Sequence, residues 1–362
     1  MAKKTTGTPS RLVTNHVFLD TDVYRQLGHN SDSPVLSTLN DRIEDSGIVL
    51  HIADVTFEEI RRQLHEYVAE TTVAMAAARK QFGRWRKRHP EIVKADIPEF
   101  DAPAVAEAAF TRLRDRIRYD WNAQVHEAMA VPASEIFGDY FGRRPPFAAK
   151  DSKEFPDAFV LKALERWCRD NGERMYVVTR DKAMTEAIAA SETLIHMAGL
   201  DDVLAALAAE ETPDIRERVE RLLSEAKIVE GLRNGIGWCI DELIPVYVGD
   251  SFADGEVTGH AMRSGDVEIA DFTVVAESPK EFGVLMEVTV PLMVNVAFDD
   301  MSSASYDRED GIYYGVEHGF AEFEADPEIR VFAKLTRDPP GVASVRILTG
   351  EVEVSEPYDD YM

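Results

Sequence analysis

His16-Val-Phe-Leu-Asp-Thr-Asp22 is a short apolar run followed by two acidic residues. An apolar run of this length between polar residues is typical of a strand buried inside a sheet. Two similar runs follow, Ile48–Ala53 and Met175–Val178, and Leu194–Met197 is a weaker fourth. Segments with helical periodicity separate the runs, which indicates parallel strands covered by helices on both faces. We therefore predict an α/β fold for this part of the chain.

Long helical segments lie between the second and third predicted strands. One helical pattern runs from Thr56 to about His89, and a second spans about Ala104 to Ala130. A further helix starts at Ser152 or Lys153 and ends near Gly172. These segments are longer than a simple crossover requires, since a dozen residues suffice to connect two parallel strands. The sequence therefore predicts a sheet with a long helical insertion.

The charge of the chain is unevenly distributed. The whole chain has 40 Lys and Arg residues against 66 Asp and Glu residues, a formal net charge of −26. Residues 1–200 contain 28 basic and 30 acidic residues, whereas residues 201–362 contain 12 and 36. Two surfaces that differ this much are rarely one domain. We place the boundary at Glu210-Glu-Thr-Pro-Asp214, where Pro213 ends one helix and opens the next.

The acidic second part has a different periodicity. After a helix over about Pro213–Arg233, the runs Glu287–Val296 and Ser344–Val354 alternate apolar and polar residues. A period of two, interrupted by Gly, Asp and Pro turns, is typical of an antiparallel sheet. We therefore expect a C-terminal β-rich (α+β) domain, whose role the sequence does not reveal. The predicted divisions are a flexible arm over 1–14, the α/β domain over 15–212 and the β-rich domain over 213–362.

The composition excludes several classes of protein. Two cysteines, Cys168 and Cys239, are too few for a disulfide framework or a four-thiolate zinc site. The nine histidines show no metal-binding spacing. No apolar stretch is long enough to cross a bilayer, and the N-terminus lacks the features of a secretory signal. We expect a cytoplasmic protein that does not bind membranes.

Acidic residues stand where the predicted strands end. Asp20 directly follows the first strand, and Asp181 follows the third. Asp157 lies near the start of a helix, and the pair Glu58-Glu59 lies early in the long helix. Ligands of open parallel sheets bind outside the carboxyl ends of the strands. Carboxylates gathered there repel one another and offer the oxygen ligands that Mg²⁺ or Mn²⁺ prefers, which is the chemistry of phosphodiester cleavage.

The order of these motifs resembles the PIN-like nuclease superfamily. The stretches that carry the resemblance are Val17-Phe-Leu-Asp-Thr-Asp22, Thr56-Phe-Glu-Glu-Ile-Arg61, Phe155-Pro-Asp-Ala-Phe159 and Val178-Thr-Arg-Asp181. The long charged helices between the second and third acids resemble a bacterial branch with an enlarged helical insertion. The resemblance covers roughly residues 15–208 and says nothing about the remainder.

The resemblance implies a site of four catalytic and metal-binding carboxylates. These are Asp20, Glu59, Asp157 and Asp181. It also implies a Mg²⁺ or Mn²⁺ cofactor and a nucleic acid substrate, RNA rather than DNA, with a role as toxin or defence effector. Family members commonly have Asn where this chain has Asp22, so Asp22 adds a further acid. Glu58 is the alternative to Glu59, and Thr179 is an additional candidate.

Two basic segments are candidates for binding nucleic acid. Arg79-Lys-Gln-Phe-Gly-Arg-Trp-Arg-Lys-Arg88 interleaves positive charge with aromatic residues, a combination that contacts phosphates and stacks on bases. Arg143-Arg144 lies in a loop close in sequence to Asp157. A solvated helix end whose aromatic residues pack inward explains the first segment equally well. The residues selected are Lys80, Arg84, Lys87, Arg88, Arg143 and Arg144.

Three functions remain open from the sequence. The first is a metal-dependent endoribonuclease of PIN-like type. The second is a phosphohydrolase of the haloacid-dehalogenase type, in which Asp20 would attack phosphorus and Asp22 would protonate the leaving group. That family also needs a catalytic Lys, for which Lys182 is a poor substitute. The third is a non-catalytic PIN-like scaffold that binds a protein partner through its acidic second part.

Overall fold

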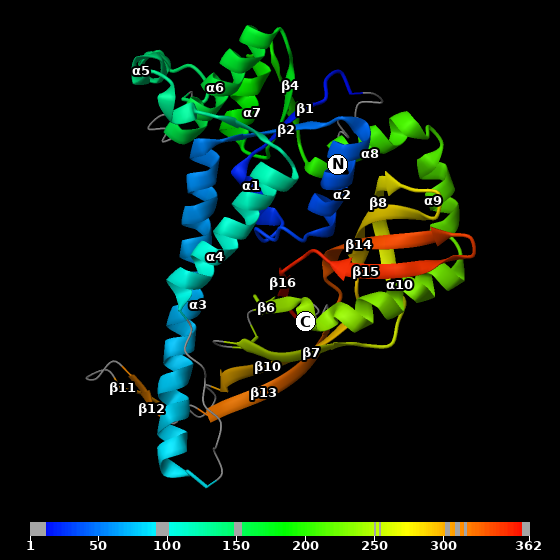
Figure 1. Ribbon diagram of the computed structural model, residues 1–362. Helices are drawn as coiled ribbons and strands as arrows, with labels where there is room; N and C mark the ends of the chain where they lie inside the picture. The colour runs from blue at the N-terminus through cyan, green and yellow to red at the C-terminus, as the bar shows by residue number, and fades with distance from the viewer. Residues whose placement is uncertain are drawn as a thin grey trace. The chain divides into compact units, whose positions relative to one another are not determined.

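The computed structural model describes residues 12–91, 101–147, 154–249, 251–252, 255–300, 305–307, 312–314 and 317–356. The chain divides into two compact units, Leu12–Val203 and the residues from Leu204 onward. The first is built on a parallel sheet and the second on antiparallel sheets (Figure 1). These architectures confirm the predicted fold class. The division falls inside helix α8 (Leu200–Glu211), and the domain boundary at residues 212 and 213 stays a prediction.

Among the described residues of the first unit, five parallel strands form one sheet in the order β3-β2-β1-β4-β5. The strands are β1 (His16–Leu19), β2 (Val49–Ala53), β3 (Gln124–His126), β4 (Met175–Val178) and β5 (Leu194–Met197). The four predicted strands are all present. The order of the chain reverses between the neighbouring strands β1 and β4, which is where open α/β sheets bind their ligands.

Both faces of this sheet are buried, which explains why its strands are continuous apolar runs. Helices α6 (Phe155–Asn171) and α7 (Lys182–Ala189) pack on the face that carries Phe18 and Val177. Residues of opposite parity, such as Val17 and Leu50, are also almost completely buried. The predicted start of α6 at Ser152 or Lys153 lies outside the described residues.

Strand β3 was not predicted, and the single helix expected over residues 104–130 is wrong. The chain instead forms α4 (Ala102–Asp115), a π-helical turn η1 (Arg116–Asp120), β3 and a short 3-10 turn η2 (Ala128–Ala130). Asn122 ends the helical path, because its φ of 47° lies in the left-handed region that a right-handed helix cannot contain. The three-residue strand is too short to produce a periodicity of its own.

Helix α3 (Asp54–Arg88) has two halves of different character. In the first half Phe57, Ile60, Leu64 and Val68 are buried, a helical stripe that packs toward the core and α4. Beyond Val68 none of the described side chains of α3 is buried. The distal half therefore has no core-facing side. No described helix is both long enough and apolar enough to span a bilayer.

The remaining helices of the first unit are short, namely α1 (Thr21–Gln26), α2 (Pro34–Ser46) and α5 (Ala133–Phe141). Residues 1–11 of the flexible arm predicted over residues 1–14 lie outside the described residues. Its last residues are attached to the unit, because Val13 N donates to the Tyr176 hydroxyl over 3.1 Å. Thr14 Oγ1 also donates to the Arg174 carbonyl over 2.8 Å. The arm over residues 1–14 stays a prediction.

The described part of the second unit contains helices α9 (Ile215–Leu223) and α10 (Ala226–Cys239), the 3-10 turn η3 (Ile240–Glu242) and several small sheets. The sheet orders are β15-β14-β9-β8, β13-β10-β7, β11-β12 and β16-β6. All pairings are antiparallel except β16 with β6. The strands are β6 (Ile244–Tyr247), β7 (Glu256–Met262), β8 (Glu268–Glu277), β9 (Glu281–Thr289), β10 (Leu292–Asp300), β11 (Ser305–Asp307), β12 (Ile312–Tyr314), β13 (Glu317–Ala325), β14 (Glu328–Arg337), β15 (Pro340–Ile347) and β16 (Glu351–Val354).

Three expectations for the second unit need correction. The helix predicted over 213–233 is two helices, and Ser224 separates them as its hydroxyl bonds to the Arg221 carbonyl. The run 287–296 is split between β9 and β10 at Pro291, which has no N–H to donate to a sheet. The run 344–354 is likewise split between β15 and β16, just before Glu351.

Candidate active site

The four predicted acids come from four different elements of the first unit. Asp20 follows β1, Asp181 stands before α7, Glu59 lies in the second turn of α3 and Asp157 in the first turn of α6. Their charges act on one another, since Asp20, Glu59 and Asp181 all raise the pKa of Asp157. The structure thus brings these acids together at the carboxyl ends of β1 and β4, and we call them, with Asp22, the acidic cluster.

Asp20 is the most buried member of the acidic cluster, with 8% of its surface exposed. Its Oδ2 accepts a hydrogen bond from Thr179 Oγ1 over 2.7 Å, and its Oδ1 accepts one from Thr21 N over 2.7 Å. Burial raises the pKa of Asp20 to about 6, and the charges of Asp22 and Glu59 add to the shift. The hydrogen bonds from Thr179 and Thr21 oppose it by stabilising the ionised form.

Thr179 connects two members of the acidic cluster. It is completely buried, and its hydroxyl accepts a hydrogen bond from Asp181 N over 3.0 Å while it donates to Asp20. The Asp181 side chain in turn accepts from Met184 N over 2.7 Å and caps α7. This hydroxyl therefore adds a buried side-chain link between the ends of β1 and β4, which the backbone bond from Asp20 N to the Val178 carbonyl also joins.

Glu59, rather than Glu58, faces the acidic cluster. Glu59 Oε2 accepts a hydrogen bond from Thr21 Oγ1 over 2.8 Å, in a partly buried position. The Glu58 side chain is 58% exposed, with Arg61 4.0 Å away. Thr21 was not selected from the sequence. In the sequence, Thr21 differs from other threonines only by its place next to Asp20.

Asp22 lies beside Asp20 with half of its carboxylate unsatisfied. Its Oδ2 accepts hydrogen bonds from Arg180 N and from Gln26 Nε2, each over 3.1 Å. Its Oδ1 is buried and has no hydrogen-bond partner among the described residues. A buried carboxylate oxygen without a donor is costly, and a cation would satisfy it.

Asp157 experiences the strongest repulsion in the acidic cluster. Burial raises its pKa, and the charges of Asp20, Glu59, Asp181 and Glu154 raise it further. Five carboxyl groups that act on one another in a partly buried place favour the binding of positive charge. This environment, and not a helix N-terminus alone, distinguishes Asp157 from an ordinary acid in the first turn of a helix.

The donor set fits a hard divalent cation. The acidic cluster supplies only carboxylate oxygens, the ligands that Mg²⁺ and Mn²⁺ prefer. One of these oxygens, Asp22 Oδ1, lacks a hydrogen-bond partner in the described part of the chain. In the part of the chain that the structure describes, no three His, Cys, Asp or Glu side chains form a ready-made coordination shell. Binding therefore requires the carboxylates to turn toward a common ion.

The basic residues predicted on α3 lie far from the acidic cluster. Lys80, Arg84, Lys87 and Arg88 are exposed on the distal half of α3. They follow Glu59 by 21 to 29 residues, which corresponds to roughly 30–45 Å along a helix. Trp85 is 57% exposed, so it does not pack inward as the simpler explanation requires. A substrate that touches both places must be long.

The two predicted arginines of the 143–144 loop have different surroundings. Arg144 forms an ion pair with Asp139 at 2.6 Å, and Lys162 contacts the same carboxylate at 3.0 Å. Arg143 is exposed and has no ion-pair partner among the described residues. Two exposed cations that the sequence did not single out for nucleic acid, Arg180 and Lys182, flank Asp181 directly.

Three histidines that the sequence treats as unrelated form a hydrogen-bonded chain. His16 Nδ1 and His51 Nε2 are 2.9 Å apart, and His51 Nδ1 and His126 Nε2 are 2.8 Å apart. The histidine chain crosses β1, β2 and β3, and the Trp167 ring of α6 contacts all three imidazoles. Burial lowers the pKa of His51 to about 3 and that of His126 to about 4. Buried neutral histidines of this kind are structural, and no signal at sequence distances of 35 and 75 residues could reveal them.

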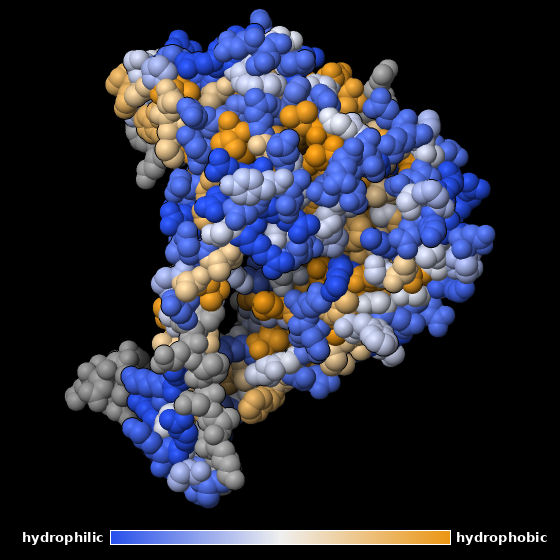
Figure 2. Space-filling view, viewed as in Figure 1, coloured by the Kyte–Doolittle hydropathy of each residue, from blue (hydrophilic) through white to orange (hydrophobic). Residues whose placement is uncertain are grey.

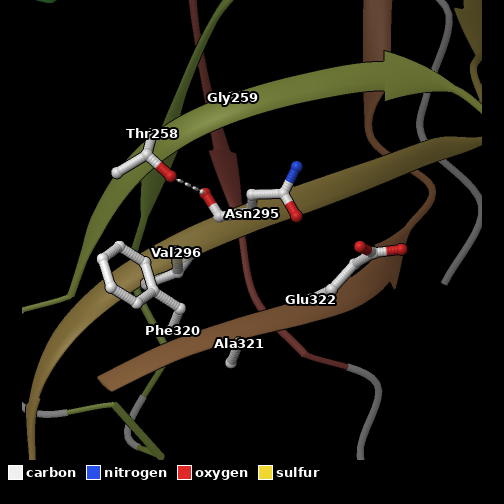
Figure 3. A pocket seen from close by; sticks show the side chains of 7 residues that line it. All are labelled: Thr258, Gly259, Asn295, Val296, Phe320, Ala321 and Glu322. Carbon is white, nitrogen blue, oxygen red and sulfur yellow. Dashed lines mark hydrogen bonds between the residues drawn. The ribbon is translucent and has the colours of Figure 1, made fainter.

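The second unit has a hollow of about 440 Å³ on the face of the β7–β10–β13 sheet (Figure 3). It contains a single carboxylate, so it is no counterpart of the acidic cluster. The side chains around it include one exposed ring and three polar groups. Its lining consists of Thr258, Gly259, Asn295, Val296, Phe320, Ala321 and Glu322.

Comparisons with known proteins assign the first unit. The family model of the PIN domain matches residues 17–184. Neither a curated protein nor a solved structure matches the chain. The matched segment begins in β1 and ends in α7, so it contains the strand ends and helix starts that carry the acidic cluster. The N-terminal part of this chain is therefore a PIN domain, a family whose members are generally metal-dependent nucleases.

Proposed function

We propose that residues 17–184 hydrolyse phosphodiester bonds in RNA, with Mg²⁺ or Mn²⁺ held by Asp20, Glu59, Asp157 and Asp181. The observation that carries the proposal is the convergence of these acids at the switch point of the sheet in a segment that matches a nuclease family. Asp22 joins them because its buried Oδ1 lacks a partner among the described residues. The family match supports the nuclease over the haloacid-dehalogenase-type phosphohydrolase. The convergence of the acids supports it over a non-catalytic PIN-like scaffold.

When bound, the divalent ion would polarise a phosphoryl oxygen and lower the pKa of a water molecule. The protein contributes the orientation of the ligands. Thr179 holds Asp20 and the backbone of Asp181, and Thr21 holds Glu59. Groups that orient ligating carboxylates in this way fix the geometry of a site before the substrate arrives.

The substrate is a polyanion, so positive charge must lie near the acidic cluster. Arg180 and Lys182 flank Asp181 and are exposed, which suits contacts with phosphate oxygens on either side of the cleaved bond. The distal half of α3 offers Lys80, Arg84 and Lys87 to a long strand. RNA is favoured over DNA by the family resemblance alone, because a fold does not fix the substrate.

The proposal is tested with end-labelled single-stranded RNA and DNA of one sequence, incubated with the full-length protein. We expect cleavage of the RNA in Mg²⁺ or Mn²⁺ and none in EDTA. Asp20→Asn and Asp181→Asn should each lose at least roughly 100-fold in rate while the proteins stay folded. Asp170→Asn, an exposed acid on the same helix as Asp157, is the matched control and should cleave normally.

Four outcomes would contradict the proposal. Cleavage that persists in EDTA, or at the wild-type rate in both Asn variants, removes the acidic cluster from the reaction. Isolation of an aspartyl-phosphate on Asp20 would instead identify the phosphohydrolase. Binding of several RNAs and DNAs without any divalent-dependent cleavage would identify a non-catalytic scaffold.

A further inference from the structure

Five aromatic side chains form a continuous ladder from the interior of the first unit to its surface. At the inner end Phe147 is 1% exposed, and its ring lies 5.4 Å from Tyr140 and 5.0 Å from Phe155. Phe155 lies 5.7 Å from Phe137, which lies 6.0 Å from Phe141 in a stacked arrangement. We call these residues the aromatic ladder.

The outer end of the aromatic ladder is open. Phe137 is 46% exposed and Phe141 is 78% exposed. They stand one helical turn apart on α5, and Figure 2 shows the apolar surface over this helix. On the other side of the helix Ile136 is 1% exposed and anchors α5. The exposed rings are therefore held on a fixed support and not on a loose loop.

The aromatic ladder is directly linked to the acidic cluster. Phe155 is the first residue of α6, and Asp157 is the third. Any movement of the α6 start would carry both the ring and the carboxylate. The aromatic ladder thus connects the two exposed rings, through Phe155, to the helix start that carries Asp157, a predicted ligand of the metal.

An exposed cation follows the exposed rings in the sequence. Arg143 follows Phe141 by two residues and is exposed, and its N donates to the Tyr140 carbonyl over 3.1 Å. It has no ion-pair partner in the described ranges, whereas its neighbour Arg144 is neutralised by Asp139 at 2.6 Å. Arg143 therefore remains available for an anion, two residues along the chain from the exposed ring of Phe141.

Resting on the nuclease function proposed above, we infer that Phe137 and Phe141 stack an unpaired nucleobase of a single-stranded substrate, with its phosphate on Arg143. Aromatic faces beside a cation are the combination that binds single strands without sequence preference. A base inside a duplex already has stacking partners on both sides and is not free for these rings. The aromatic ladder therefore selects unpaired segments of the substrate and holds the neighbouring phosphate on Arg143.

The inference is tested by binding, in an Asp20→Asn background that prevents cleavage of the probe. The probe is a single-stranded RNA that contains 2-aminopurine, whose fluorescence falls when the base stacks on a ring. Phe137→Ala/Phe141→Ala should weaken binding roughly 5-fold or more for each stacked base and restore the fluorescence. Phe137→Tyr/Phe141→Tyr should retain both properties, whereas Phe137→Leu/Phe141→Leu should lose the quenching.

Phe320→Ala provides the matched control, because Phe320 in the second unit is also 78% exposed. It should leave binding and quenching unchanged. Arg143→Gln should weaken binding and reduce its salt dependence, because it removes one phosphate contact. A duplex of the same sequence should bind equally to the wild-type and Ala proteins.

The inference and the nuclease function fail in different ways. Unchanged binding and quenching in the Ala variant would overturn the inference, even if the wild type cleaves RNA. Loss of binding in the Ala variant would support it even if no cleavage is ever found. If the Ala variant binds RNA normally but changes oligomeric state in sedimentation, the rings are a protein interface and the inference is wrong.

Discussion

The hydroxyl of Thr179 donates to Asp20 Oδ2 over 2.7 Å and accepts from Asp181 N over 3.0 Å. It thereby joins the ends of β1 and β4 at the place where the strand order reverses. Thr179 is completely buried, so no bulk water can replace it. One side chain thus orients two members of the acidic cluster that are 161 positions apart in the sequence, residues 20 and 181.

Thr179→Val should impair the proposed nuclease through Asp20. The variant keeps the shape of the side chain but removes the hydrogen bond that lowers the pKa of Asp20, so this pKa should rise above its present value of about 6. We expect the rate to fall roughly 10- to 100-fold and the rising limb of the pH–rate profile to move to higher pH. Thr179→Ser, which keeps the hydroxyl, should restore most of the rate. A Val variant with the wild-type profile would show that Thr179 does not position Asp20.

Asp157→Asn should stabilise the protein in the absence of divalent ions. Burial and four neighbouring carboxyl groups raise the pKa of Asp157 in the folded state, so its stabilising contribution is present at low pH and is lost as pH rises through that pKa. The variant should gain roughly 1 kcal/mol or more over the wild type at pH 8, and little at pH 4. Thermal unfolding at both pH values measures the difference. Asp41→Asn, at an exposed position in the middle of α2, is the control and should show no such dependence.

The same experiment with added Mn²⁺ examines the ligand role of Asp157. An ion that binds only the folded state raises the melting temperature by mass action. Added Mn²⁺ should raise the melting temperature of the wild type more than that of Asp157→Asn. An equal response of the two proteins would exclude Asp157 as a ligand.

The histidine chain should make the first unit sensitive to acid. Burial lowers the folded-state pKa of His51 to about 3, with further contributions from His126 and His16, so the unfolded chain binds protons first as pH falls below about 6.5. Stability that is complete above this pH should therefore be lost toward pH 4. The slope is up to about 1.4 kcal/mol per pH unit for each histidine that stays neutral. Denaturant unfolding between pH 7.5 and 4.5 measures the slope.

His51→Gln removes one of these protonation sites. The variant should have a shallower slope over this range than the wild type, whatever its stability at pH 7.5. His65→Gln, at a more exposed position on α3, should keep the wild-type slope. Identical slopes for wild type and His51→Gln would mean that His51 is not held neutral by its surroundings.

The strands and the acids behind them could be read from short segments. The run before Asp20 and the run before Asp181 are each apolar without alternation, because both faces of the parallel sheet are buried. Parallel strands end at the same edge, so acids that follow them share a location whatever the intervening sequence. This is why the sequence could propose Asp20 and Asp181 as neighbours. Their roles in metal binding and catalysis stay predictions.

Short or discontinuous features could not be predicted. Strand β3 has three residues and follows a helical pattern, so a window of helical periodicity covers it. The hydroxyl of Thr179 bonds to residues at the ends of two strands, a role that only the packing of those strands reveals. The same packing buries Asp22 Oδ1 without a hydrogen-bond partner among the described residues. The choice of Glu59 over Glu58 also depends on tertiary structure. Only the packing of α3 beside Thr21 shows that Glu59 accepts the hydrogen bond from the Thr21 hydroxyl.

The sequence by itself determined the alternation of strands and helices, the acidic second part and the chemical nature of the cluster. These properties follow from residue types over windows of a few turns, in which burial alone sets the pattern. Only the tertiary structure decided that His16, His51 and His126 form a chain and that the rings of α5 lead to the start of α6. It also decided that the basic half of α3 stands roughly 30 Å or more from Glu59. Contacts between distant segments depend on how the elements pack, and no local pattern of residues records that packing.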